Sequence, residues 1–198
     1  SVNNIMIALY AFVIISFFIT IVDIIIRFPL QSEMIDYNDI QAIVINVLAL
    51  LIQIVFFAYG FVNAIRGMLS PKRMGAVIVA FFAATCITGT GNMVINSNVQ
   101  IVLWWIVLII PNIVGAVATF AYFVSGKKSK IYSIIIYLAA IWGMFRIIYS
   151  NYNLIVHANQ YLSMNSTVRL VLGIAIHCLV IYQTYVLWIK RQNATDIS

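Results

Sequence analysis

The sequence has very little charge. Lysine and arginine together number 11 and aspartate and glutamate 5, which is 8% of the 198 residues. Soluble domains carry about 25% charged residues, whereas 64% of this chain is hydrophobic. Sixteen charges cannot cover the surface of a soluble globule of this size. The shortage excludes a soluble enzyme, a nucleic-acid-binding domain and a disordered chain, and it predicts an integral membrane protein.

Residue types that carry chemistry are also scarce. The chain has two cysteines and two histidines, and Asp23 is the one carboxylate inside an apolar run. Metal hydrolysis and paired-acid proteolysis therefore lack their ligands, and no H-E-x-x-H, G-x-S-x-G or P-loop motif occurs. His157 and His177 differ in expected depth, which argues against a shared haem. We expect no enzyme activity, no cofactor and no metal, and cysteines that are reduced packing residues.

Long apolar runs make up most of the sequence. A helix needs about 20 apolar residues to cross about 30 Å of hydrocarbon, and these runs are too long for barrel strands. We predict an all-α fold, a polytopic six-transmembrane-helix bundle that forms a single domain over residues 1–198. The predicted spans are about 5–26, 40–65, 74–95, 101–124, 131–150 and 168–189.

The start of the chain carries two further expectations. The first span should be a retained helix and not a signal peptide, because Ser1–Asn4 has no positive charge and no small-residue cleavage site follows the apolar run. This helix should break at Arg27-Phe28-Pro29, where charge and proline interrupt the apolar residues.

The basic residues predict the orientation. With six spans, eight of the eleven lysines and arginines fall on one side, and they are Arg66, Lys72, Arg73, Lys127, Lys128, Lys130, Lys190 and Arg191. The other side has three arginines and four of the five acids. The positive-inside rule then predicts a multi-pass cell-membrane protein with both termini in the cytoplasm. The basic balance is a topology signal and not a sign of nucleic-acid binding.

Polar and small residues recur at three- and four-residue steps, so every span can turn one polar face to a shared interior. The stripe of span one includes Ser16 and Thr20, that of span two Gly60 and Asn63, that of span four Asn112, Gly115 and Thr119, that of span five Trp142, Arg146 and Tyr149, and that of span six Gly173, His177 and Thr184. Pro111 should free a backbone carbonyl one turn earlier and kink span four. The simpler interpretation of the stripes is helix packing.

Three ionisable residues from three spans share one depth. At about 1.5 Å per residue, Asp23, Arg146 and Arg169 lie in the outer third of the bilayer. Arg146 and Arg169 lack acidic partners on their own helices. We predict an outward-facing polar pocket with a positive bias, whose ligand-binding residues are Asp23, Arg146, Arg169, Asn46, Asn92, Tyr149 and His177. The alternatives are that both arginines extend to the outer headgroups and that His177 is a hydrogen-bonded structural residue.

Three functions fit these features. The first is a small transport-type protein that binds an anionic or zwitterionic solute and works with other membrane subunits or as a homo-oligomer. The second is a non-catalytic structural subunit of a membrane complex. The third is a sensor or immunity protein that reads an extracellular peptide with its outer loops. Each has membrane lipid as a partner, and none involves nucleic acid.

Overall fold

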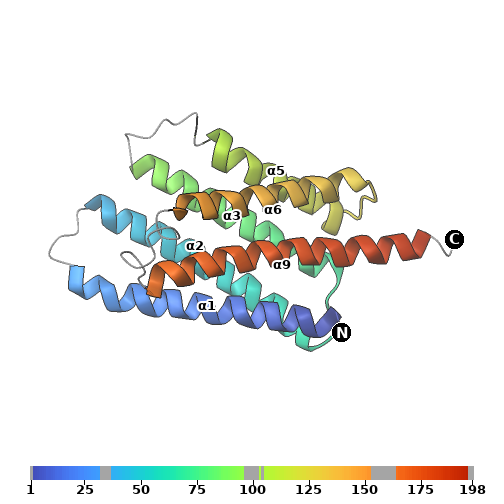
Figure 1. The fold of residues 1–198 in the computed structure, drawn as a ribbon, viewed down its shortest axis with the longest axis horizontal. Helices are drawn as coiled ribbons and strands as arrows, with labels where there is room; N and C mark the ends of the chain where they lie inside the picture. The colour runs from blue at the N-terminus through green and yellow to red at the C-terminus, as the bar shows by residue number, and fades with distance from the viewer. Residues whose placement is uncertain (1, 32–36, 96–102, 104, 153–163, 196–198) are drawn as a thin grey trace.

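In a computed structural model the chain forms a bundle of long helices (Figure 1). The structure describes residues 2–31, 37–95, 103, 105–152 and 164–195. The helices are α1 (Val2–Gln31), α2 (Tyr37–Ile65), α3 (Pro71–Ile95), a composite fourth helix of η2 (Trp105–Ile109), α5 (Ile110–Thr119) and η3 (Phe120–Val124), then α6 (Lys130–Ser150) and α9 (Met164–Thr195). Over these residues no strand occurs, and six helices are long and apolar enough to cross a membrane. The all-helical prediction and the number of candidate spans are confirmed.

Five of the helices are longer than the apolar runs that predicted them, and the fourth is described from Trp105 to Val124. The expected break at Arg27-Phe28-Pro29 is wrong, because α1 continues to Gln31. α2 begins at Tyr37 and α9 at Met164, ahead of their predicted apolar starts. Hydropathy marks only the part of a helix that suits hydrocarbon, whereas backbone hydrogen bonding continues into the flanking polar residues. Proline removes a single donor, which α1 tolerates near its end.

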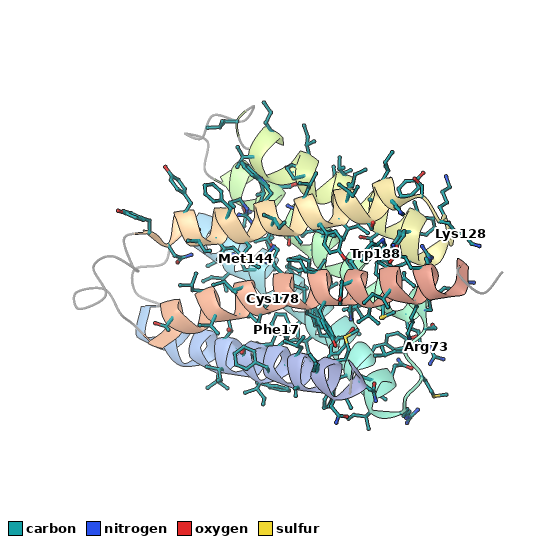
Figure 2. All side chains as sticks on the ribbon, turned by 45° about the vertical axis from the view of Figure 1, so that its right-hand side comes forward. Phe17, Arg73, Lys128, Met144, Cys178 and Trp188 are labelled. Carbon is teal, nitrogen blue, oxygen red and sulfur yellow. The ribbon has the colours of Figure 1, made fainter. Side chains whose placement is uncertain are left out.

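The helices form a closed ring. Each packs against the next helix in the sequence, α9 packs against both α6 and α1, and α3 and α9 touch across the middle. α1 begins and α9 ends at the same end of the bundle, on the right in Figure 1. The connections at 66–70 and 125–129 lie at this end as well, and Figure 2 shows Arg73 and Lys128 there. We call it the basic end.

The interior is filled by large side chains, and the outward faces are apolar. Tyr10 and Phe57 are at most 1% exposed and meet edge to face, with ring centroids 6.1 Å apart. On the outer faces of α2, α5 and α6, Val55, Val117 and Leu138 are 65%, 63% and 61% exposed. Monomeric soluble proteins rarely expose continuous apolar surface. The surface is therefore compatible with a multi-pass membrane protein.

Glycines mark the closest approaches between neighbouring helices. At six of them an added β-carbon would collide with a side chain of the adjacent helix. The pairs are Gly60 with Tyr10, Gly75 with Phe123, Gly89 with Leu108, Gly115 with Phe82, Gly143 with His177 and Gly173 with Ile147. We call them the glycine contacts. Small residues let helix backbones approach closely, which is the usual way of packing helices in an apolar solvent.

The contact between α6 and α9 is reciprocal. His177 of α9 lies on Gly143 of α6, and Ile147 of α6 lies on Gly173 of α9. From the first contact to the second, the sequence advances by four residues on α6 and goes back by four residues on α9. This is expected for antiparallel helices that each use one face. Residues Ser133, Ile136, Ala140 and Gly143 continue this buried face at alternating steps of three and four.

The glycine contacts give a stability prediction. At Gly115 an added β-carbon would lie 2.9 Å from the Phe82 ring and 3.0 Å from Ala139, so three helices meet there. We expect Gly115→Val to lower the free energy of unfolding by about 1–3 kcal/mol, because overpacking forces side chains or backbone to shift. Thermal unfolding in detergent measures the change. Ala83→Val, at an exposed position of α3, is the control and should stay near wild type. Equal melting temperatures for both variants would contradict this packing.

Candidate functional site

The structure places four of the seven predicted ligand-binding side chains. They are Asn46, Arg146, Tyr149 and His177. Asp23, Asn92 and Arg169 lie on the backbones of α1, α3 and α9, but their side chains are outside the described residues. Asn46 is half-buried in α2 and has an interaction partner. The predicted ligand-binding site can therefore be compared with the structure mainly at Arg146, Tyr149 and His177.

His177 is enclosed between three helices. Its side chain is 3% exposed, and its ring meets Phe81 of α3 edge-on, with centroids 5.0 Å apart. Nδ1 lies 2.6 Å from the carbonyl oxygen of Gly173. Because a carbonyl only accepts, Nδ1 donates this hydrogen bond, and Nε2 is the nitrogen that lies against Gly143. The geometry gives His177 a packing role, and its role toward a ligand stays a prediction.

Arg146 is the charged residue of this interface. It lies one helical turn after Gly143, on which His177 packs, and it is half-buried. Within the described part of the chain, Arg146 has no hydrogen-bond or ion-pair partner. No Asp or Glu occurs anywhere between residues 40 and 195, so α6 and α9 cannot supply a carboxylate. Its guanidinium N–H donors therefore make no hydrogen bond to the described residues.

The predicted polar stripe of α6 is wrong for two of its three members. Trp142 is 40% exposed and Tyr149 is 73% exposed, so both lie on the outer face. There they stack in a row with Phe145, at centroid distances of 5.9 and 6.2 Å. Large rings with one polar atom suit an apolar or interfacial surface, whereas the small residues of α6 take the interior. The proposed ligand contact of Tyr149 would have to be made from this outer face.

The proline in the fourth helix frees a backbone carbonyl one turn earlier, as predicted, while the kink stays a prediction. Pro111 has no N–H, so the carbonyl of Val107 loses its helical donor. The indole Nε1 of Trp142 donates to this oxygen at 2.7 Å, and it thereby ties α6 to the fourth helix. Asn112 donates from Nδ2 to Leu108 O at 2.6 Å in the same region. The π-helical turn η2, directly before the proline, was not predicted.

The sequence interpretation missed a buried polar pair. Gln183 of α9 donates from Nε2 to the Tyr10 hydroxyl of α1, and both side chains are 0% exposed. The Tyr10 ring lies on Gly60 of α2. Gln183 Oε1 has no hydrogen-bond partner among the described residues. The two residues are far apart in sequence and belong to no motif, and only the ring closure of α9 on α1 brings them together.

Two arginines fasten helix ends at the basic end. Arg73 donates from Nη1 to Asn63 Oδ1 at 2.8 Å and to Met68 O at 2.7 Å. Arg191 donates from Nη2 to Tyr122 O at 2.6 Å and lies 4.2 Å above the Tyr122 ring. Cations near the last carbonyls of a helix satisfy these acceptors and the helix dipole. The sequence did not predict these hydrogen bonds, because the distribution of basic residues along the chain indicates only which side of the membrane they occupy.

Comparison of the chain with protein-family models, curated proteins and solved structures found no match. The class that the fold defines is an all-helical bundle with six candidate membrane spans. Any function must therefore be argued from the residues of the bundle itself.

The Tyr10–Gln183 pair gives the second prediction. Tyr10→Phe leaves both Nε2 and Oε1 of the buried Gln183 amide without a hydrogen bond to the described residues. We therefore expect the free energy of unfolding to fall by about 1–3 kcal/mol. Gln183→Leu removes the whole amide and should cost less. The double variant should resemble Gln183→Leu alone, because the unpaired amide is gone. Tyr59→Phe, at an exposed position, is the control. Additive losses in thermal or denaturant unfolding would show that the pair is not coupled.

Proposed function

We propose that the chain is a multi-pass membrane protein whose six apolar helices cross the bilayer. Two observations support this proposal. Six helices are long and apolar enough to cross a membrane, and their outward faces are rich in exposed aliphatic and aromatic side chains. Helices satisfy their backbone hydrogen bonds internally, which hydrocarbon requires. In water the same faces would aggregate.

We propose further that the basic end faces the cytoplasm of a cell membrane, with both termini on that side. The support is the gathering of Arg66, Lys72, Lys127 and Lys128 near the connections at 66–70 and 125–129. Short cytoplasmic loops are enriched in lysine and arginine. Arg146 then lies in the outer half of α6.

The function that these features favour best is of transport type: the bundle binds a small anionic or zwitterionic solute from the outer side. The observation that carries this proposal is Arg146, a half-buried cation without a described partner in a stretch that has no carboxylate. A charge inside a membrane span costs about 2.5–3.5 kcal/mol at the centre, and intramembrane charges usually mark a ligand path. Guanidinium binds carboxylate and phosphate through two parallel hydrogen bonds.

The remaining predicted residues take supporting roles in this proposal. Arg169 and Asp23 orient the charged groups of the solute, and Asn46, Asn92 and Tyr149 add hydrogen bonds. His177 packs on Gly143, one helical turn before Arg146. At this size the bundle needs other subunits or further copies of itself to move a solute.

A second candidate function is that of a non-catalytic subunit in a membrane complex. The exposed row of Trp142, Phe145 and Tyr149 on α6 favours it, because aromatic side chains are enriched at interface cores. A pull-down in mild detergent separates the two candidates. Obligate recovery with the same partner proteins supports the subunit, and a stable isolated chain that binds solute supports the first proposal.

Arg146 gives the third prediction. The purified chain should be stabilised against heat by a member of a panel of glutamate, succinate, glycine and phosphate. A ligand at 100 times its Kd adds about 2.7 kcal/mol. Arg146→Ala should abolish most of this shift, because the bidentate contact is lost, and Arg146→Lys should restore only part of it.

The controls for this prediction come from the same chain. Arg66→Ala removes an exposed charge at the basic end and should leave the ligand-induced shift intact. Arg169→Ala tests the second predicted arginine. Unchanged binding in both Arg146→Ala and Arg169→Ala, or no stabilisation by any member of the panel, would remove the solute-binding proposal.

A further inference from the structure

The basic end carries a cluster of positive charge assembled from two distant segments. Two lysines belong to the connection between η3 and α6, a third is the first residue of α6, and two basic residues belong to the last turns of α9. The members of this basic cluster are Lys127, Lys128, Lys130, Lys190 and Arg191. The four lysines are exposed. Residues 40–195 contain no acid, so no carboxylate of α6 or α9 neutralises the cluster, and Asp196, directly after α9, lies outside the described residues.

Arg191 holds the two segments together. It donates from Nη1 to Lys127 O at 3.1 Å and from Nη2 to Tyr122 O at 2.6 Å. Gly126 has φ of 70°, a left-handed turn that glycine adopts without strain. Lys127 N also donates to Ala121 O at 3.0 Å. The lysines therefore project from a fixed turn, and Lys128 lies near the end of α9 in Figure 2.

Apolar side chains lie directly next to this positive charge. Phe120, Ile131 and Ile134 are 54%, 62% and 52% exposed, within two turns of the lysines on the same two helices. Lys127 Nζ lies 5.7 Å from the centroid of the Tyr132 ring. An occupant that satisfies both features needs an anionic head and an apolar tail. An acidic peptide or a soluble phosphate would leave the apolar residues uncovered.

We propose that the basic cluster is a binding site for the headgroup of an anionic phospholipid, with its acyl chains along Phe120 and Ile131. The site rests on the proposed membrane insertion. The lysines contact the negatively charged phosphate of the headgroup, and Arg191 positions them without itself being the main contact. Basic pockets between spans on the cytoplasmic side commonly bind anionic lipids. The bound lipid fixes the η3–α6 connection to the end of α9.

The connection at 66–70 provides a matched comparison. It has Arg66 and Lys72 exposed, but Arg73 is engaged by Asn63 Oδ1 and Met68 O. No second segment adds charge there through a described contact. Removing two charges at this connection tests general attraction to an anionic surface, whereas removing charges at the basic cluster tests the site.

The experiment uses the full chain, purified in mild detergent, and native mass spectrometry. Phosphatidylglycerol and phosphatidylcholine with the same acyl chains are titrated separately. The wild-type chain should retain phosphatidylglycerol in preference to phosphatidylcholine. The triple variant Lys127→Gln/Lys128→Gln/Lys130→Gln should bind it about 100-fold more weakly, at about fivefold per lysine, and Arg66→Gln/Lys72→Gln should bind close to wild type.

Other outcomes decide against the site. Equal weakening in both variants means general surface attraction, and no preference for phosphatidylglycerol means no anionic site. Competition by inorganic phosphate at equal strength means a soluble anion. If wild type retains neither lipid and does not insert into phosphatidylcholine bilayers, the membrane proposal itself fails. The variants must keep the wild-type melting temperature in phosphatidylcholine, which their exposed positions lead us to expect.

Discussion

Close approach of helix backbones at glycine is the constraint on which the rest of this structure depends. If the bundle lies in a bilayer as proposed, its helices gain little from burying apolar side chains, and van der Waals packing holds them together. Each of the six glycine contacts admits a side chain of the neighbouring helix that no larger residue would accommodate. They occur between α1 and α2, between α3 and the fourth helix, and between α6 and α9. These contacts set how closely these neighbouring helices approach, and those between α6 and α9 place Arg146 one helical turn from Gly143, on which His177 packs.

Polar groups are satisfied at the places where the regular helix pattern fails. Pro111 frees Val107 O, and Trp142 donates to it from the next helix. At the basic end, Arg73 donates to the Asn63 side chain of α2 and to Met68 O in the connection that follows, and Arg191 donates to Tyr122 O of η3. The same arginines that predict topology in the sequence thus join helix ends in the fold. The exposed lysines beside them remain available for an outside partner.

The number of spans was predictable from the sequence because each apolar run is long enough to cross hydrocarbon. The buried stripes of α1 and α5, with Ser16, Thr20 and Asn112, were predictable from helical periodicity. The stripe of α6 was not, since Trp142 and Tyr149 have polar atoms but large apolar rings. Helix ends were missed because hydropathy does not report on backbone hydrogen bonding.

The candidate site was predictable only in part. Periodicity identified Arg146 and His177 as members of facing stripes, but their closeness depends on the α6–α9 register, which Gly143 and Gly173 set. The Tyr10–Gln183 pair could not be found, because it depends on closure of the ring between the first and last helices.

The most direct test of the account is the side of the membrane on which each end of α6 lies. Single cysteines are introduced as Ser129→Cys and Tyr152→Cys after Cys86→Ala and Cys178→Ala, and a membrane-impermeant maleimide is applied to intact cells. The account predicts that Tyr152→Cys reacts in intact cells and that Ser129→Cys reacts only after lysis. The reverse pattern, equal labelling of both sites in intact cells, or recovery of the chain in the soluble fraction would contradict it.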